Sequence, residues 1–313
     1  MEQHLNYHNP VMLAQSIEGL NIKPNGIYVD LTFGAGGHSR AILEKLDEHG
    51  KLFAFDCDTD TKENLIDDPR FTFINHNFNH IKNHLYYYGV EKVDGILGDL
   101  GVSSHQLDSE SRGFSYRFDC DLDMRMDMRK ELKASDILNK YSREELSRIF
   151  YQYGNIAGAY KLSQIIVQQR ETSPFTTSED FIQRISSCIP QGKEFGYLSR
   201  LYQSLRMIVN DEVSVLRSVL EQSVALLKPR GRIVVISYHS VEDRLVKVFL
   251  RSGNFYDTIE KDLYGNMLSP LKVITKKAIR PNEEEVNENN RSRSAKLRIA
   301  EKIKYYGKQI STH

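Results

Sequence analysis

The sequence contains little cysteine, and its three cysteines, Cys57, Cys120 and Cys188, lie far apart. They form no Cys-x-x-Cys pair, so the sequence indicates neither a zinc site nor a disulfide framework. It also lacks any apolar run of about eighteen residues and any continuous apolar segment near its start, which argues against a membrane span and a secretion signal. We therefore expect a cytoplasmic protein that uses no metal.

An excess of charge of either sign is also absent. The 42 lysines and arginines equal the 42 aspartates and glutamates in number, so no net field attracts the whole molecule to nucleic acid or to a membrane. Binding of that kind must come from local patches. The 313 residues, 40% of them hydrophobic, suffice for one large domain or two modest ones.

Residues 27–58 have the pattern of a nucleotide-binding βαβ unit. An apolar run over residues 27–31 precedes the turn Thr-Phe-Gly-Ala-Gly-Gly-His of residues 32–38, and apolar positions at helical spacing follow. A second apolar run ends at Asp56. Glycines let the backbone approach a ligand, and an acid about twenty residues further on can accept both ribose hydroxyls. The pattern predicts a site for an adenosine-type cofactor.

Further apolar runs over residues 70–74, 93–100 and 233–237 predict more strands of the same sheet. Strands that alternate with helices form a doubly wound parallel sheet, whose strand ends line one crevice. Asp30, Asp56, Phe78 and Asp99 fall at such ends. A dehydrogenase would instead need a helix N-terminus aimed at a pyrophosphate. The second acid, Asp99, favours a methyltransferase that uses S-adenosylmethionine over an NAD-dependent dehydrogenase.

Residues 108–213 have helical spacing throughout, including a Ser-Arg-Glu-Glu capping box at residues 142–145. We therefore expect an α/β domain formed by residues 1–107 and 214–313. An all-helical insertion, residues 108–213, would then cover the crevice.

The C-terminal part is locally basic, with eleven basic and five acidic side chains over residues 272–308. A solvated run of charge would explain this composition. Serines and arginines that alternate on an edge strand would also suit the RNA backbone, with Arg291, Arg293 and Lys296 on phosphates. Both interpretations stay open.

Several motifs resemble one family, in the same order along nearly the whole chain. They are Gly-Ala-Gly-Gly-His-Ser (34–39), Asp-Gly-Ile-Leu-Gly-Asp-Leu-Gly-Val-Ser-Ser (94–104), Arg-Gly-Phe-Ser-Tyr (112–116), Leu-Asp-Met-Arg-Met-Asp (122–127), Val-Asn-Asp-Glu (209–212), Ser-Tyr-His-Ser-Val-Glu-Asp-Arg (237–244) and Arg-Ser-Arg-Ser-Ala-Lys-Leu-Arg (291–298). Together they resemble the bacterial 16S rRNA cytosine-N4 methyltransferases of type H.

The resemblance implies methyl transfer from S-adenosylmethionine to the N4 amine of a cytidine in the decoding region of 16S rRNA, within the small ribosomal subunit. It also implies a Rossmann-like α/β methyltransferase domain of class I, with a helical insertion that recognises the RNA substrate. Carried over by position, it also implies a cofactor site of Gly36, Gly37, His38, Asp56, Phe78, Asp99 and Gln106. The chain departs from the family pattern at residues 120–121, at residues 155–156 and around Gly196. These departures lie in the predicted insertion, so they concern RNA contacts more than the cofactor pocket.

The chemistry needs a positioned amine and an acceptor for its protons, because the amine of cytosine is conjugated with the ring. The segment after the fourth strand could supply that acceptor through Asp99, a backbone carbonyl, or the hydroxyls of Ser103 and Ser104. Asp99 could instead be wholly committed to the cofactor. His239 could remove the proton, or could shape the pocket by bonding Asp243 or a backbone group.

The residues that contact RNA are also left open. Phe114 and Tyr116 are the candidates to stack on a flipped base. Four arginines could clamp phosphates or pair with acids of the same motifs: Arg112, Arg125, Arg206 and Arg244, facing Asp123, Asp127, Glu212 and Asp243. A non-catalytic ribosome-assembly factor remains the alternative function, and either a monomer or a homodimer is compatible with the sequence.

Overall fold

A computed structural model describes residues 10–259, 261, 263–265 and 268–304. The chain divides into two compact units. The α/β unit comprises Met1–Gly101 and Val215–His313, and the helical unit comprises Val102–Ser214. The predictions for residues 1–9 and for the last basic residue, Lys308, fall outside the described residues. Within the described part, no helix is long and apolar enough to cross a membrane.

The α/β unit is built on a seven-stranded sheet in the order β3-β2-β1-β4-β5-β7-β6. Its strands are β1 (Ile27–Asp30), β2 (Lys51–Phe55), β3 (Phe71–Ile74), β4 (Val93–Asp99), β5 (Leu227–Ser237), β6 (Leu271–Val273) and β7 (Lys296–Lys302). The first five strands pair in parallel, and β7 runs antiparallel to both of its neighbours. The predicted Rossmann-like α/β fold is confirmed.

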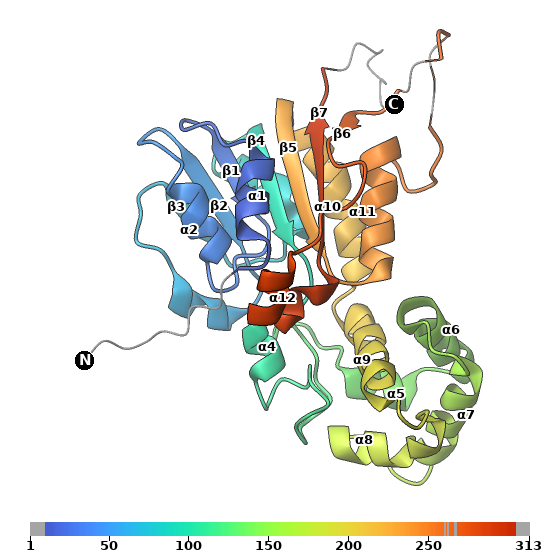
Figure 1. Cartoon of the computed structure of the whole chain (residues 1–313). Helices are drawn as coiled ribbons and strands as arrows, with labels where there is room; N and C mark the ends of the chain where they lie inside the picture. Colours follow the sequence, from blue (N-terminus) through green and yellow to red (C-terminus); the bar gives the residue numbers. More distant parts are fainter. Residues whose placement is uncertain (1–9, 260, 262, 266–267, 305–313) are drawn as a thin grey trace. The chain divides into compact units, whose positions relative to one another are not determined.

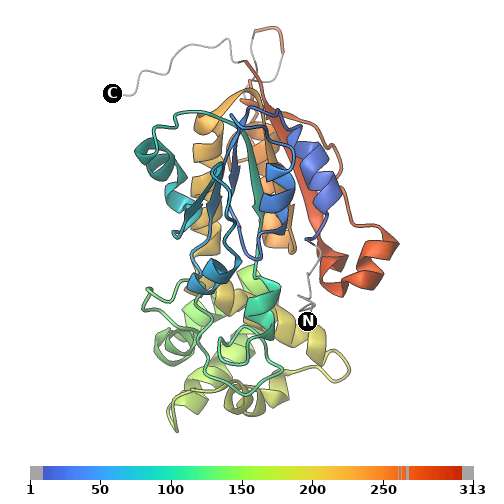
Figure 2. The same ribbon diagram turned by 90° about the vertical axis from the view of Figure 1, so that its left-hand side faces the viewer.

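Helices cover both faces of this sheet (Figures 1 and 2). Helices α1 (Leu13–Leu20) and α2 (Gly37–Leu43) share a core with Leu52, whereas α3 (Ile81–Tyr87), α10 (Glu212–Leu226) and α11 (Ser240–Ser252) share one with Phe53 and Phe55. Successive side chains of a strand point to opposite faces, so a strand covered on both faces needs an almost continuous apolar run. This requirement explains why the strands could be predicted.

Two predictions for the C-terminal part are wrong. The strand predicted over residues 233–237 begins earlier, because β5 starts at Leu227 and continues through Pro229 and Gly231, where its pairing with β4 shifts register. Arg230, with φ of 66°, lies within the irregular segment. The alternating serines and arginines do not form an edge strand either. They form the 3-10 helix η4 (Asn290–Ser294), and β7 lies inside the sheet between β5 and β6.

The helical unit has its own hydrophobic core. Its helices are α4 (Ser104–Asp108), α5 (Ala134–Lys140), α6 (Arg143–Gly154), α7 (Ala159–Arg170), α8 (Ser178–Arg184), η3 (Ser186–Cys188) and α9 (Glu194–Val209). The expected capping box starts α6, where Ser142 and Glu145 bond each other's backbone N–H. Asn155 ends this helix in the left-handed conformation with φ of 47°, and Ile156 is 1% exposed in the core. The departure at residues 155–156 is therefore a helix end and a core contact.

Three short helical segments complete the description of the α/β unit. The 3-10 helix η1 (Thr59–Asn64) follows β2, and η2 (Phe78–His80) follows β3. Helix α12 (Glu283–Glu288) leads into η4. Its Glu285 side chain accepts a hydrogen bond from the backbone N–H of Met12, at 2.6 Å, and so joins the two ends of the α/β unit.

Candidate active site

Asp30, at the end of β1, is fully buried and organises the turn that follows it. Its carboxylate accepts hydrogen bonds from the Thr32 backbone N–H at 3.0 Å and from the Ser39 hydroxyl at 2.7 Å. Burial raises the pKa of Asp30. Its 0% exposure means that Asp30 supports the site from beneath and does not line it.

Asp56 follows β2 and fastens the glycine turn to that strand. Its Oδ2 accepts a hydrogen bond from the Gly34 backbone N–H at 2.9 Å, and its Oδ1 accepts one from the Asp58 N–H at 2.9 Å. Burial raises the pKa of Asp56 to about 6, against these two bonds, which lower it. Each carboxylate oxygen has more than one lone pair. The half-buried Asp56 can therefore also accept the ribose hydroxyls that its position predicts.

The glycines of the turn differ in what lies above them. A Cβ on Gly37 would lie 2.2 Å from Cγ of Pro10, and one on Gly36 would lie 2.5 Å from Nη1 of Arg40. Gly34 has φ of 50°, and no described atom would lie within 4 Å of its Cβ. Space for a ligand therefore exists over Gly34, which was not among the predicted cofactor residues. Gly37 is also required by the packing of the chain itself, and Gly36 by its left-handed backbone, with φ of 78°.

Phe78, another predicted cofactor residue, is the first residue of η2 and is partly buried against the core of the sheet. The next carbonyl, of Asn79, accepts hydrogen bonds from Nε2 of Gln222 at 2.6 Å and from the Ser218 hydroxyl at 3.2 Å. Both donors lie on α10. Two side chains without any motif in the sequence thus fix the backbone next to Phe78.

Asp99, the last residue of β4, is held from two sides. Its backbone N–H donates a hydrogen bond to Oγ1 of Thr32 at 2.8 Å, in the turn after β1. Its Oδ1 accepts a hydrogen bond from the Tyr238 hydroxyl at 2.7 Å, from the end of β5. Asp99 therefore connects the ends of three strands.

The charges around Asp99 oppose one another. Burial raises its pKa to about 6, and the nearby Asp30 and Glu242 raise it as well. His38 and the hydrogen bond from Tyr238 lower it. His38 is 6% exposed, and its Nε2 lies 3.2 Å from the carbonyl oxygen of Val11. The carboxyl group is therefore ionised at neutral pH but lies within reach of a protonation step.

His239 caps the N-terminus of α11. Its Nδ1 lies 3.5 Å from the backbone nitrogen of Glu242, and its Nε2 lies 3.2 Å from Oε1 of the same residue. The interpretation in which His239 bonds Asp243 is wrong, because Asp243 binds Nζ of Lys296 at 3.0 Å and Nε of Arg298 at 2.7 Å. If His239 shapes the pocket, it does so through its contacts with Glu242.

Ser103, Ser104 and Gln106 start helix α4 in the helical unit. Oγ of Ser103 accepts a hydrogen bond from the Gln106 N–H at 3.1 Å, and Oε1 of Gln106 accepts one from the Ser103 N–H at 3.1 Å. This capping box gives both side chains a local structural role. Ser104 is the first residue of the helix.

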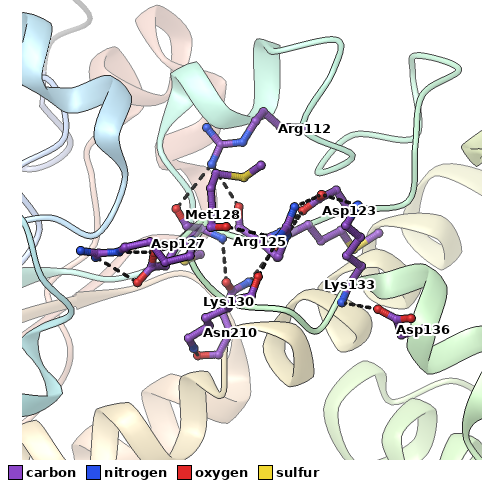
Figure 3. A network of polar contacts seen from close by, with 12 residues as sticks. Arg112, Asp123, Arg125, Asp127, Met128, Lys130, Lys133, Asp136 and Asn210 are labelled. Carbon is purple, nitrogen blue, oxygen red and sulfur yellow. Dashed lines mark hydrogen bonds and ion pairs between the residues drawn. The ribbon is translucent and has the colours of Figure 1, made fainter.

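Two arginines predicted to contact RNA tie together a loop of the helical unit (Figure 3). Arg125 forms a fork with Asp123, with Nε–Oδ1 at 2.8 Å and Nη2–Oδ2 at 2.7 Å. Its Nη1 donates to the carbonyl of Lys130 at 2.6 Å. Nη2 of Arg112 donates to the carbonyl of Arg125 at 3.0 Å. The guanidinium groups of both arginines are thus engaged inside the unit.

Arg206 is engaged in the same way, through a fork with Glu212 at 2.7 and 2.9 Å. Of the two predicted stacking residues, Phe114 is 6% exposed and belongs to the core of the unit. Tyr116 is half-buried, and its ring meets Phe195 with centroids 6.0 Å apart. Phe195 is 66% exposed and was not selected from the sequence, where a single phenylalanine at a helix start carries no signal.

The remaining predicted cations lie on the α/β unit. Arg244 on α11 and Arg293 in η4 are exposed, and neither has a hydrogen bond or ion pair with another described residue. Arg291 and Lys296 are half-buried, and Lys296 is paired with Asp243. Of the cations predicted to contact RNA on the α/β unit, Arg244 and Arg293 are therefore the ones exposed and available to bind phosphate.

Residues 6–303 match the MraW methylase family. The chain belongs to the MraW methylase family. Three relatives are each called ribosomal RNA small subunit methyltransferase H. That of Christiangramia forsetii is 50% identical over 96% of this chain and 99% of its own length. Those of Parabacteroides distasonis and Cytophaga hutchinsonii are 51% and 52% identical, over 95% of this chain and 98% and 99% of theirs.

Membership of the MraW methylase family confirms the resemblance drawn from the motifs and the predicted class of enzyme, a methyltransferase that uses S-adenosylmethionine. It also removes the dehydrogenase alternative.

Proposed function

We propose that this protein transfers a methyl group from S-adenosylmethionine to the N4 amine of a cytidine in the decoding region of 16S rRNA, in the small ribosomal subunit. The observation that carries the proposal is the arrangement of strand ends. Strand β1 lies between β2 and β4, so the glycine turn after β1 is flanked by Asp56 on one side and by Asp99 on the other.

The residues around this turn fit the methyl donor. Asp56 would accept the ribose hydroxyls, Phe78 would contact the adenine ring, and the space over Gly34 would admit the ligand. His38, Gly36 and Gly37 support the turn, and Gln106 belongs to the same predicted set. When bound, S-adenosylmethionine supplies an electrophilic methyl group on a sulfonium centre.

Positioning is the main contribution that the protein can make, since a well-oriented pair of reactants can gain roughly 7 to 11 kcal/mol. Asp99 is the side chain best placed to accept a hydrogen bond from the amine, because with a pKa of about 6 it is a carboxylate at neutral pH. The hydroxyls of Ser103 and Ser104 and the imidazole of His239 are the other candidates for this role.

RNA binding is proposed for the exposed groups and not for the engaged arginines. Arg244 and Arg293 can reach phosphates without losing an internal partner, and each such contact would add to the salt dependence of binding. In the helical unit, Tyr116 and the exposed Phe195 offer aromatic surface for stacking on an unpaired base. The aromatic pair of Tyr116 and Phe195 supports a role of residues 108–213 in substrate recognition.

The test is mass spectrometry of 16S rRNA after incubation with the protein and isotopically labelled donor. Free RNA and small subunits from cells that lack the enzyme serve as parallel substrates. We expect one labelled N4-methylcytidine in the decoding region. Calorimetry with S-adenosylmethionine accompanies the assay. If the protein binds the donor and the subunit but no label is transferred, the non-catalytic assembly factor is the better description.

A matched variant tests the role of Asp99. Asp99→Asn keeps the shape of the side chain and an oxygen for the Tyr238 hydroxyl, but it removes the charge. We expect a loss of methylation that exceeds the loss of cofactor affinity. Normal cofactor binding together with the full methylation rate would rule out Asp99 as the acceptor.

A further inference from the structure

Tyr238 is held in place at several points at the end of β5. Its backbone N–H donates to Oε2 of Glu242 at 3.3 Å, in the first turn of α11. Its ring packs near Gly101, where a Cβ would lie 3.6 Å from Cδ2 of the tyrosine. The residue before it, Ser237, is paired with Lys296 of β7. The hydroxyl of Tyr238 is therefore presented by a fixed backbone.

This hydroxyl reaches one oxygen of Asp99 and leaves the other unengaged. The Tyr238 hydroxyl donates to Oδ1 of Asp99 at 2.7 Å. Oδ2 of Asp99 has no hydrogen-bond partner among the residues that the structure describes. Asp99 is also the only residue of β4 with partial exposure, whereas the six residues before it are buried.

We propose that Tyr238 is a positioning residue for the methyl-transfer reaction, which holds Oδ1 of Asp99 so that Oδ2 is presented to the amine hydrogens of the substrate. This inference rests on the proposed function, because it assigns a purpose to one side of the Asp99 carboxylate. Without the tyrosine hydroxyl, the carboxylate would turn about χ2, a broad and roughly two-fold torsion in aspartate, and would offer either oxygen.

The same hydrogen bond also favours the charged form of the carboxylate. Burial and the charges of Asp30 and Glu242 raise the pKa of Asp99, and His38 and Tyr238 oppose them. Removing the tyrosine hydroxyl leaves only His38 among these opposing groups, so the pKa of Asp99 rises further. A protonated Asp99 donates at one oxygen and accepts an N–H less well. The role of Tyr238 therefore has a signature in the pH profile.

The experiment compares Tyr238→Phe with the native protein in methylation of small subunits between pH 5.5 and 8.5. We expect the acidic limb of kcat to move to higher pH. For a rise of one unit from a pKa of about 6, the ionised fraction of Asp99, and with it the rate, falls about fivefold near pH 6 and hardly at all near pH 8.5. A loss that is equal at all pH values would overturn the proposal.

Tyr28→Phe is the matched control. It also removes the hydroxyl of a buried tyrosine, one that accepts a hydrogen bond from the Lys23 N–H at 2.7 Å at the opposite end of β1. We expect Tyr28→Phe to lower stability and to leave the pH profile unchanged. A shifted profile in this control would mean that the effect of Tyr238→Phe is a general effect on the fold.

A double-mutant comparison separates action through Asp99 from direct action on the ligand. In the Asp99→Asn background, adding Tyr238→Phe should change the residual rate less than twofold, since the charged partner is already absent. A full additional loss would show that Tyr238 itself contacts a reactant, and the proposal would fail.

Titration of Asp99 by carbon NMR of the labelled carboxyl group distinguishes this inference from the proposed function. Suppose that the pH midpoint of Asp99 rises in Tyr238→Phe but that the native protein transfers no methyl group. The effect of the Tyr238–Asp99 hydrogen bond would then be supported, and the proposed function would be rejected. An active enzyme whose Asp99 midpoint is the same in both proteins would retain the function and reject the inference.

Discussion

Two aspartate–arginine ion pairs in the helical unit have the same geometry but differ in the exposure of the arginine. They therefore allow the effect of burial on the stability of an ion pair to be measured. Asp123 accepts the backbone N–H and the side chain of Arg125, and Asp127 binds Arg129 through the same set of atoms. The Arg125 side chain is 13% exposed, whereas that of Arg129 is 48% exposed. Nη1 of Arg125 also donates to the carbonyls of Met128 and Lys130.

We expect Arg125→Ala to lower the free energy of unfolding by about 3–5 kcal/mol, because it leaves Asp123 partly buried without its main partner. Arg129→Ala should cost about 0–1 kcal/mol, because the Arg129 side chain is 48% exposed and water can replace it beside Asp127. Urea unfolding followed by circular dichroism at 222 nm measures both. Equal losses would refute the argument that burial decides the strength of these forks.

The same pair of variants separates a structural arginine from one that binds RNA. A phosphate contact that is lost should flatten the slope of log K against log salt by about one unit. We expect Arg125→Ala to leave this slope unchanged in the protein that remains folded, and Arg244→Ala to flatten it. A flattened slope in Arg125→Ala would mean that its guanidinium group leaves Asp123 to bind RNA.

Three more outcomes follow from single contacts. Burial raises the pKa of Asp99 to about 6 from 3.8. The contribution of this group to stability is therefore full below pH 4 and is lost as the pH rises through 6. In urea unfolding, Asp99→Asn should be more stable than the native protein by up to about 3 kcal/mol at pH 7.5 and equally stable at pH 4. Asn210→Ala should cost about 1–3 kcal/mol for each buried group that it orphans, including the Met126 N–H bonded at 2.8 Å, and urea unfolding against the native protein measures this loss. Gly34→Ala should weaken S-adenosylmethionine binding in calorimetry at least roughly tenfold, because it fills open space and strains the turn at its φ of 50°. Gly37→Ala, which meets Pro10, should chiefly lower the melting temperature. Equal effects of the two glycine variants on cofactor affinity would contradict the difference in their surroundings.

The parts of the fold that the sequence predicted are those with local signals. Strands β1, β2 and β4 are apolar runs that end beside an acid, and both the runs and the acids follow from burial on two faces and from the position of the crevice. The place of β7 could not be read in this way. Its alternation of Leu297 and Ile299 with polar residues is typical of an edge strand. Its pairing with β6 and the bridge between Leu297 and Ile279 make it internal.

The candidate site was predictable to a similar extent. The identity of the acids follows from spacing, but their partners come from distant parts of the chain. Tyr238 is 139 positions away from Asp99 along the chain, and Gln222 is 143 away from Asn79. For the arginines, the sequence did not distinguish between binding to RNA phosphates and pairing with acidic side chains. The structure selects the acid for Arg125 and Arg206, because each carboxylate is near enough to form a fork.

The long stretch of sequence between the paired strands β4 and β5 also affects how the chain folds during synthesis. Strand β4 ends at Asp99 and its parallel partner β5 begins only at Leu227, so at 5–20 residues per second translation needs about 6–25 s to supply the missing neighbour. During that interval the nascent chain carries an unpaired, apolar strand edge, which other chains can bind. The topology thus leaves that edge unpaired for a fixed time during synthesis, independent of how stable the finished molecule is.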